Sequence, residues 1–340
     1  MTNTQLTLEE ISTLAKEALI ASGASAGAAS SLAAAVTAAE RDGIRSHGLI
    51  YVPIYCEHLK CGKVNAAAEP AVLSQDGSAI VIDADCGFAH PAIDIGFDKL
   101  RPLAKALGCA ALTVRNSYNC GVLGYHVERL AEEGLVAIGF TNAPASIAPA
   151  GGQKPVVGTN PFALAVPSGS GSAAFVLDQS ASVVAKSEIM TRAREGRSIP
   201  EGWALDAEGQ PTTDPEQALK GSMAPSGGYK GFGIGLLVEV MAAALSGATL
   251  GIHASPFSGT EGGPPRTGQC FLALSPDAFS SDTFDDRIQA LTQAIATQGD
   301  ARLPGSHRLG HRQRSESDGV SVDQSLVDRI QSIAVGNATR

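Results

Sequence analysis

The feature that most constrains the fold is an alternation of short strand-like runs with helical stretches. Apolar, β-prone runs occur at residues 79–83, 110–114, 136–141, 162–166 and 175–178. Helical periodicity lies between them, for example over residues 93–107 and 125–133. This order predicts an α/β or mixed α+β fold, and a chain of 340 residues is long enough to form two domains.

The chain ends predict further helices. Thr7 and Glu10 form a capping box for a first helix, which Gly23 ends. We expect a second helix over residues 25–41 and a third over residues 46–62. A bend is expected at Pro53, and two C-terminal helices are predicted near residues 283–297 and 322–334.

Two later segments contrast in composition. Residues 231–246 form an almost uncharged helix, interrupted only by Glu239, and such a helix belongs in an interior or a subunit interface. Residues 252–268 are rich in Gly, Pro and Ser, and they predict a long surface loop.

Charge and composition exclude several classes of partner. A net charge of −9 disfavours nucleic acid, and no apolar run or leader pattern indicates a membrane span or export, so we expect a cytoplasmic protein. The six cysteines form no CxxC pair and predict reduced thiols. Spacings typical of metal ligands are missing, and no metal is expected.

The first candidate site segment is Arg45-Ser46-His47-Gly48. Ser46 is a favourable N-cap, which puts His47 in the first turn of a helix, where the helix dipole favours the neutral imidazole. Such a histidine acts as a general acid if a nearby carboxylate restores its basicity. In the alternative interpretation Ser46 only caps a helix, and His47 is an ordinary surface or core histidine.

Two glycine-containing segments are candidate anion-binding loops. The first runs from Gly151-Gly152-Gln153-Lys154-Pro155 through Gly158-Thr159-Asn160-Pro161. Its Thr159 hydroxyl or Asn160 amide can hold a carboxylate or carboxamide, although a simple tight turn fits equally well. Residues 225–231, with Lys230, lead into the uncharged helix and suit a phosphate. Neither a Walker loop nor a GxGxxG spacing is present there, so a bound dinucleotide requires a fold other than Rossmann.

The fourth segment is basic. Four arginines and two histidines lie between Arg302 and Arg314 without an acidic residue, which favours a diphosphate or 2′-phosphate site, with a solvated basic face as the alternative. Asp178 and Glu188 add carboxylates that can accept from an imidazole N–H or a ribose hydroxyl, unless they are simply exposed acids.

Taken together, these segments resemble the non-Rossmann malate/L-lactate dehydrogenase family, which includes Δ1-piperideine-2-carboxylate and Δ1-pyrroline-2-carboxylate reductases. The matching runs follow one another in order over nearly the whole chain. They are RSHG (45–48), NS (116–117), GTNP (158–161), IPEGW (199–203), PTTDP (211–215), GGYKG (227–231) and LPG (303–305).

The resemblance implies a fold and an assembly. A mostly antiparallel or mixed cofactor sheet, in place of a Rossmann sheet, would stand beside a helical domain built from both chain ends. Residues 1–115 and 285–340 would form the helical, substrate-binding and dimerisation domain, and residues 116–284 the NAD(P)-binding domain. The family likeness also implies a homodimer.

The resemblance also assigns roles to residues. His47 would donate the proton, with Ser46 and Glu188 as relay partners, while Tyr51 and Thr159 would lie at the substrate. The implied cofactor contacts are Asp178, Gln179, Ser180, Tyr229, Lys230, Arg302, Leu303, Pro304, Gly305, Ser306, His307 and Arg308. The arginines favour NADPH, with NADH as the alternative.

Two departures from the family pattern fall at positions where the resemblance implies contact with the substrate. The arginine that commonly follows SHG is Tyr51 here, and the histidine of the Asn-Ser-x-His run is Asn119. Loss of an arginine removes a bidentate clamp for a second carboxylate, unless Arg45 or Arg115 replaces it.

These features predict a reductase that uses NADPH on a small cyclic 2-imino acid. Δ1-Pyrroline-2-carboxylate would give L-proline, and Δ1-piperideine-2-carboxylate would give L-pipecolate. One alternative is an NAD(P)-dependent 2-hydroxy-acid dehydrogenase for malate, L-lactate or a sugar acid, in which His47 protonates a carbonyl oxygen. A second alternative is an inactive cofactor-binding protein.

Overall fold

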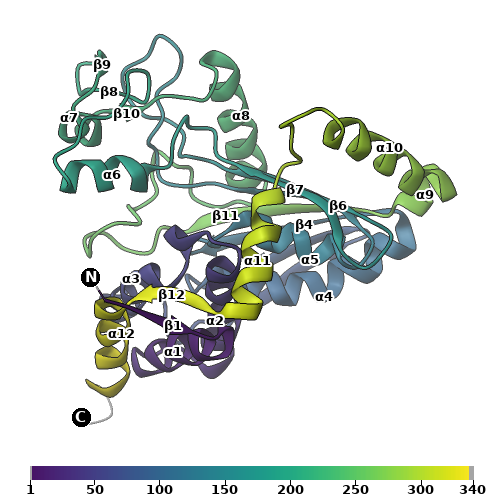
Figure 1. The fold of residues 1–340 in the computed structure, drawn as a ribbon, viewed down its shortest axis with the longest axis horizontal. Helices are drawn as coiled ribbons and strands as arrows, with labels where there is room; N and C mark the ends of the chain where they lie inside the picture. The colour runs from purple at the N-terminus through teal and green to yellow at the C-terminus, as the bar shows by residue number, and fades with distance from the viewer. Residues whose placement is uncertain (1, 337–340) are drawn as a thin grey trace.

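The computed structural model describes residues 2–336 and is centred on a seven-stranded mixed sheet (Figure 1). Strands β3 and β4 are parallel, and all other neighbouring pairs in this sheet are antiparallel. In spatial order the strands are β2 (Ala71–Asp76), β3 (Ala79–Asp83), β4 (Cys109–Ser117), β11 (Thr267–Leu274), β5 (Val136–Thr141), β6 (Phe162–Pro167) and β7 (Ala173–Gln179). The predicted mixed, non-Rossmann sheet is confirmed.

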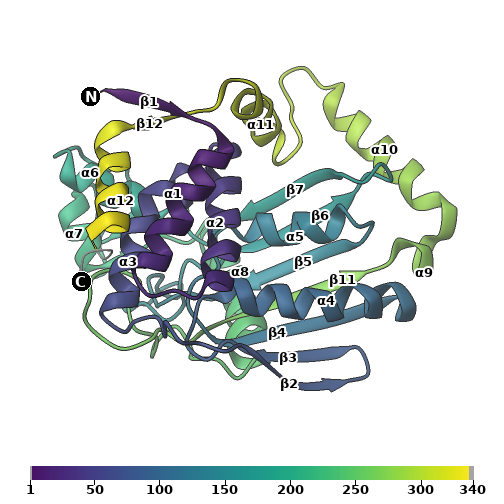
Figure 2. The same ribbon diagram turned by 90° about the horizontal axis from the view of Figure 1, so that it is seen from below.

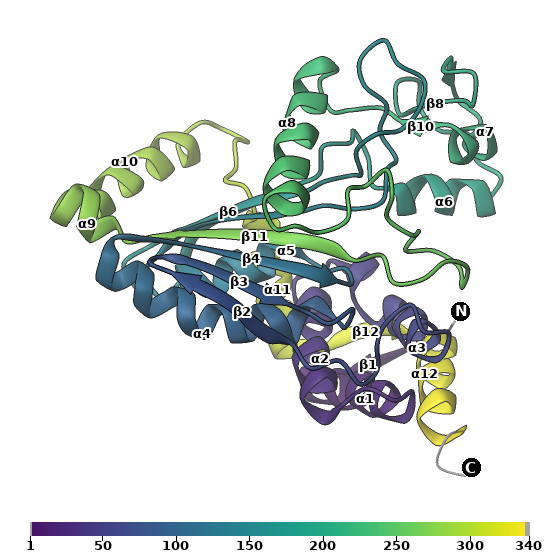
Figure 3. The same cartoon turned by 180° about the vertical axis from the view of Figure 1, so that it is seen from behind.

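Helices α4 (Ala89–Leu107) and α5 (Leu123–Ala131) cover one face of this sheet (Figures 2 and 3). Ile93, Phe97 and Leu100 repeat at helical spacing along α4, and all three are fully buried against the sheet. Gly96 permits the close approach, because a Cβ there would lie 2.4 Å from the Leu112 side chain of β4. Burial of each such apolar side chain contributes about 1.5–3 kcal/mol.

A helical unit is built from both chain ends, as the family likeness implied. Strand β1 (Asn3–Leu6) pairs antiparallel with β12 (Val320–Asp323), and the N-terminal helices share one core with the C-terminal one. The predicted Thr7–Glu10 capping box is present. The helices of this unit are α1 (Leu8–Ala21), α2 (Ala26–Arg41), α3 (Val52–Lys60) and α12 (Gln324–Gly336).

A third group of elements lies on the side of the sheet away from α4 and α5 (Figures 1 and 3). It has a small sheet of order β10-β8-β9 and its own apolar core. Its elements are α6 (Lys186–Arg194), β8 (Ala204–Leu205), β9 (Pro211–Thr212), α7 (Pro215–Lys220), β10 (Ser222–Met223), α8 (Tyr229–Glu239) and the π-helical turn η3 (Val240–Ala244).

The chain then forms β11 and returns to the helical unit. Helices α9 (Pro276–Ser280) and α10 (Phe284–Ala296), with the short turn η4 (Ser281–Thr283), extend beyond one end of the sheet (Figure 1). Helix α11 (Ser306–Asp318) lies between the sheet and the helical unit. No helix in residues 2–336 is long and apolar enough to cross a membrane, and no group of three potential metal-ligating side chains forms in that part of the chain.

Several element predictions need correction. Residues 46–62 do not form one helix, because two 3₁₀ turns precede α3, and Pro53 lies at its start without bending it. The expected loop over residues 252–268 ends where the unpredicted strand β11 begins. Residues 71–115, which we placed with the helical domain, contribute β2, β3, α4 and most of β4 to the large sheet, so the sheet extends N-terminally of the expected boundary.

Candidate active site

His47 lies in a short turn that replaces the expected helix start. The two 3₁₀ turns η1 (Arg45–His47) and η2 (Leu49–Tyr51) follow one another, and neither has a side-chain cap. The prediction that Ser46 caps a helix is therefore wrong. The Ser46 hydroxyl lies instead 3.0 Å from Nδ1 of His47. This contact joins the imidazole to an exposed hydroxyl and leaves Nε2 for another partner.

A pocket of about 140 Å³ brings His47, Tyr51 and Thr159 together. All three were predicted as site residues. Asn119, which stands in place of the family's histidine, also lines it. The remaining lining residues come from β5, from the loops around it and from the loop before β11: Cys120, Gly121, Thr141, Asn142, Ala143, Pro161 and Phe257. None of the lining residues is a lysine or an arginine.

The electrostatic surroundings of His47 favour a neutral imidazole. Burial lowers the pKa of His47, and the negative charge of Asp178 opposes that effect. Asp178 is thus the carboxylate that acts on His47 electrostatically. Glu188, the expected relay partner, lies on α6 and accepts a hydrogen bond from Arg192 at 3.0 Å. Its role as a relay partner stays a prediction.

Tyr51 belongs to an aromatic cluster that forms one wall of the pocket. Its ring is parallel to that of His47, with 6.5 Å between centroids, and lies 4.8 Å from the ring of Tyr55. Burial raises the pKa of the Tyr51 hydroxyl, and hydrogen bonding with Tyr118 and Asn119 opposes the rise. The wall at this position is therefore flat, aromatic and uncharged, where an arginine would bring a positive charge.

The loop that carries Thr159 is held by Asn160. The fully buried Asn160 amide donates to the Gly235 carbonyl at 2.9 Å and to the Glu239 carboxylate at 2.7 Å, and its oxygen accepts from Ala143 N–H. The suggestion that the Asn160 amide holds a ligand is therefore wrong. Asn160 positions the loop, while Thr159 lines the pocket.

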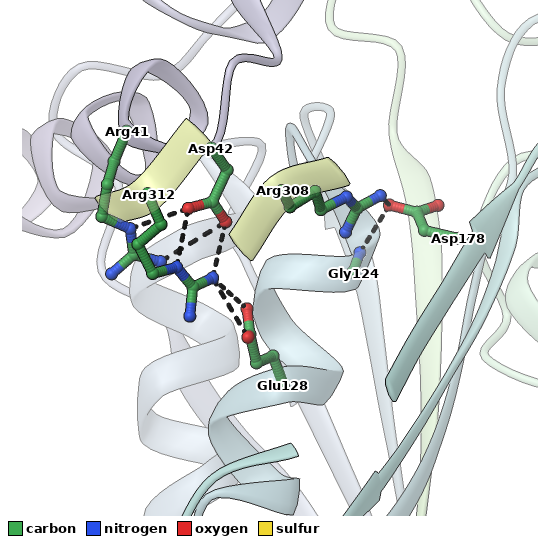
Figure 4. Close-up of polar contacts among 7 residues, drawn as sticks. All are labelled: Arg41, Asp42, Gly124, Glu128, Asp178, Arg308 and Arg312. Atoms are coloured by element: carbon green, nitrogen blue, oxygen red, sulfur yellow. Dashed lines mark hydrogen bonds and ion pairs between the residues drawn. The ribbon is translucent and has the colours of Figure 1, made fainter. Parts of the chain in front are cut away.

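The start of α11 and the adjoining strand β7 form a second hollow of about 60 Å³. Arg308, one of the lining residues, lies 3.6 Å from the carboxylate of Asp178, which accepts the Gly124 N–H at 2.8 Å (Figure 4). Gly305 adopts a φ of 81°, and a Cβ there would lie 2.8 Å from the Val176 carbonyl. A backbone this close to the sheet suits a ligand that lies across both elements.

The basic run divides into two groups. Arg302 and His307 are exposed and contact each other, and Arg308 flanks the hollow, so these three are placed to meet an anion. Arg312 also lines the hollow, but its guanidinium pairs with Asp42 at 2.7 Å and Glu128 at 3.0 Å (Figure 4). Leu303, Pro304 and Ser306 also line the hollow.

The remaining predicted cofactor residues lie on linked loops. The Ala181 N–H donates to the Thr159 carbonyl, and the Ser226 N–H donates to the Ala181 carbonyl, both at 2.8 Å. These bonds place the end of β7, with exposed Gln179, and the half-buried Ser180 that follows beside the loop that leads to Tyr229 and Lys230. Both of these last residues are exposed at the start of α8.

The residues present fit an extended dinucleotide. Basic side chains meet the positive end of the thirteen-residue helix α11 at one hollow, and Asp178 connects that hollow electrostatically to His47. Phosphates would lie near Arg302 and Arg308, and the reacting end would lie near His47. Sequence reasoning missed Cys120, Asn142 and Phe257, which carry no motif and reach the pocket only through the fold.

Comparisons with known proteins agree with this arrangement. Residues 6–331 match the model of the malate/L-lactate dehydrogenase family. A (2R)-3-sulfolactate dehydrogenase (NADP(+)) of Chromohalobacter salexigens is 44% identical over 97% of this chain and 98% of that protein. A Δ1-pyrroline-2-carboxylate reductase of Agrobacterium fabrum is 38% identical, with 96% of each chain covered.

The fold is also similar to solved structures of this family. The crystal structure of a Δ1-piperideine-2-carboxylate reductase from Pseudomonas syringae pvar. tomato has a TM-score of 0.92 and 32% identity to this chain. The match covers 97% of this chain and 99% of that one. Both the sequence and the fold are thus shared with these oxidoreductases over almost their full length, and the chain belongs to the malate/L-lactate dehydrogenase family.

Proposed function

We propose that the protein is an NADPH-dependent reductase of a small cyclic 2-imino acid, such as Δ1-pyrroline-2-carboxylate or Δ1-piperideine-2-carboxylate. The observation that carries the proposal is the lining of the His47 pocket, which combines a histidine and an aromatic wall but includes no lysine or arginine. A flat ring with a single carboxylate suits such a pocket, whereas a second anionic group would lack a cationic partner.

In the proposed reaction the pocket residues orient the acceptor and supply the proton. Thr159 and neighbouring backbone groups hold the substrate carboxylate, and the ring of Tyr51 packs against the substrate ring. His47 gives its proton to the imine nitrogen, and the Asp178 charge favours the protonated imidazole that this step requires. The Ser46 hydroxyl accepts the Nδ1–H throughout, and solvent returns a proton to Nε2 after the product leaves. NADPH, when bound, supplies the hydride.

The cofactor choice rests on the basic groups at the start of α11. Arg302, His307 and Arg308 would hold the phosphates, and a 2′-phosphate suits the arginine forks, which favours NADPH over NADH. Asp178 would accept from a ribose hydroxyl after Arg308 turns toward phosphate. Tyr229 and Lys230, exposed beside the segment after β7, would complete the contacts.

We further propose that the protein assembles as a homodimer through the outer face of α8 and η3. Leu236, Leu237, Val240 and Leu245 are 47–61% exposed along this face. Between residues 229 and 246 the charged residues are Lys230 and Glu239, and Glu239 is buried. An uncharged apolar stripe of this kind is typical of a subunit interface, and a second copy presents an identical stripe.

A second candidate is a dehydrogenase of a 2-hydroxy acid, because the relative that is 44% identical acts on (2R)-3-sulfolactate. His47 would then protonate a carbonyl oxygen. The sulfonate would need a cation, and Arg45 is an exposed arginine two residues from His47. This candidate fits the same proton donor and cofactor site.

The substrate test compares initial rates of NADPH oxidation on pyrroline-2-carboxylate, piperideine-2-carboxylate, pyruvate, oxaloacetate, diketogulonate and 3-sulfopyruvate. We expect kcat/KM for a cyclic imine to exceed that for each oxo acid by about tenfold or more, equivalent to ~1.4 kcal/mol in transition-state binding. Higher kcat/KM on 3-sulfopyruvate would replace the proposal with the second candidate. Protection of the fold by NADPH with no turnover on any acceptor would identify an inactive binding protein.

The proton-donor test uses His47→Ala with the preferred acceptor. We expect kcat to fall by about 10²–10⁴-fold, because a positioned general acid contributes that much, while NADPH affinity stays near the parent value. Glu17→Ala on the exposed side of α1 serves as the control. A variant at position 47 with parent-like kcat would remove His47 from the mechanism.

A further inference from the structure

Glu40 is a buried carboxylate beneath the turn that carries His47. It lies near the C-terminal end of α2, is 5% exposed, and accepts the Leu49 N–H at 2.7 Å. Burial raises the pKa of Glu40, and the Leu49 hydrogen bond and the charge of Arg45 oppose that rise. A buried carboxylate costs free energy unless hydrogen bonds or opposite charges compensate for its lost hydration.

Gly48 shows how closely this carboxylate packs against the turn. Its φ is −90°, so the left-handed backbone that favours glycine is not the reason for this residue. A Cβ at position 48 would instead lie 2.1 Å from Oε1 of Glu40 and 2.5 Å from its Cδ. Gly48 is therefore needed because Glu40 occupies the space where a side chain would begin.

The same contact lies between the two 3₁₀ turns. Neither η1 nor η2 has a side-chain cap, and Gly48 is the residue where one turn ends and the other begins. Glu40 binds the first N–H of η2, and the Leu49 side chain beside it is fully buried in the helical core. His47 and Leu49 flank Gly48, so a fixed Leu49 also limits where the imidazole can point.

We propose that Glu40 is a positioning residue of the reaction, which holds the His47 turn against α2 so that the imidazole faces the pocket. Glu40 acts through His47 and touches neither substrate nor cofactor. The inference rests on the proposed role of His47 as proton donor. Loss of the carboxylate would free the turn and lower the rate of proton transfer without weakening the binding of either ligand.

The first test compares Glu40→Ala with Glu40→Gln, which keeps an oxygen that accepts the Leu49 N–H. We expect Glu40→Ala to lower kcat by about tenfold or more with KM and NADPH affinity unchanged, because misplaced catalytic groups cost rate at this scale. Glu40→Gln should recover most of kcat. Leu32→Ala, a core change on the same helix, is the control for lost stability alone, and it should leave kcat unchanged below its own unfolding temperature.

The second test uses Gly48→Ala alone and with Glu40→Ala. The single change should lower kcat because its Cβ displaces the carboxylate, whereas the double variant should lose no more than Glu40→Ala, since the space is then free. The inference is overturned if the loss of kcat in the double variant equals the product of the two single losses. Unchanged kcat in Glu40→Ala would also overturn it, as would equal effects of that change on kcat and on NADPH affinity. Should Glu40→Ala fail to fold, Gly48→Ala alone tests the inference: kcat should fall while KM stays at the parent value, and an unchanged kcat would overturn it.

A third comparison separates this inference from the proposed function. In a His47→Ala background, Glu40→Ala should cause no additional loss, because its effect passes through the imidazole. Full activity of His47→Ala itself would overturn the proposed function. Inactive His47→Ala combined with fully active Glu40→Ala would overturn only the role of Glu40.

Discussion

Two histidines lie fully buried under the loop that forms one side of the His47 pocket. His126 donates through Nε2 to the Cys120 carbonyl, 2.9 Å away, whereas its Nδ1 and both ring nitrogens of His90 have no hydrogen-bond partner within residues 2–336. Since only an N–H can bond to a carbonyl, Nε2 of His126 carries the proton. Burial lowers the pKa of His126 to about 4 and holds the pKa of His90 well below its usual value. Both rings are neutral in the folded protein.

This burial predicts a loss of stability in mild acid. Above pH 6.5 both histidines are neutral in the folded and the unfolded chain, so they add no pH dependence. Below that pH the unfolded chain binds protons that the folded chain excludes, and the free energy of unfolding falls by up to ~1.4 kcal/mol per pH unit for each histidine, down to about pH 4 for His126. His126→Gln should flatten this slope in urea unfolding series from pH 8 to 4.5. Identical slopes for parent and variant would contradict the assignment.

At the level of single residues, the sequence identified the candidate catalytic and substrate-binding side chains but not the residues that surround and support them. His47, Tyr51 and Thr159 were found because they stand in or beside family motifs. Phe257 was not, since its place depends on a loop folding back across the aromatic cluster, and Glu40 gave no signal because its partner lies nine residues away on a different element.

Ion pairs, rather than buried apolar side chains, fix the position of helix α11. It has no buried residue, and Arg312 at its centre bonds Asp42 of the turn after α2 and Glu128 of α5 (Figure 4). These two acids are 8% and 11% exposed. One guanidinium therefore ties the candidate phosphate-binding helix to both the helical unit and the sheet.

Removal of Arg312 should destabilise the protein and the cofactor site together. Arg312→Ala leaves the largely buried Glu128 without a cation and leaves Asp42 with Arg41 alone, for which we expect a loss of about 3 kcal/mol in the free energy of unfolding. Arg314→Ala on the same helix removes an exposed arginine and should cost less than about 1 kcal/mol. Urea unfolding and NADPH titration of both variants measure the effects. Equal stability of the two variants would show that the Arg312 contacts are not structural.

Elements were missed where tertiary contacts override local pattern. The sequence of α11 has no apolar stripe, so periodicity gave no helix there. Strand β11 follows a Gly- and Pro-rich loop and reads TGQCFLAL, with few β-branched residues, yet it occupies the middle of the sheet. The helix expected from Ser46 is split at Gly48, because Glu40 takes the Leu49 N–H.

At the scale of the whole molecule, the proposed dimer depends on the apolar face of α8 and η3. The uncharged helix was recognised from sequence, since all-round apolarity needs no tertiary knowledge. The sequence alone does not show which side of this helix is buried. In the fold, Gly235 and Val238 face inward, while Leu236 and Leu237 face outward.

A charge placed on this face should separate the proposed dimer. Leu237→Glu introduces a carboxylate that association would bury, and we expect a monomer in light scattering at concentrations where the parent is a dimer. Leu291→Glu on α10 alters an equally exposed leucine outside the stripe and should leave the parent mass. A dimeric Leu237→Glu protein would exclude this face as the interface.

The antiparallel pairing of β1 with β12 has a consequence for biosynthesis. Val320 and Val322 of β12 share a core with Leu14 and Leu19 of α1 and with Leu49, two residues after the His47 imidazole. During synthesis the N-terminal helices therefore cannot complete their apolar core until Val320 and Val322 have left the ribosome. Translation that stops before these two valines would leave the helices partly uncovered and open to proteolysis, however much of the central sheet had already formed.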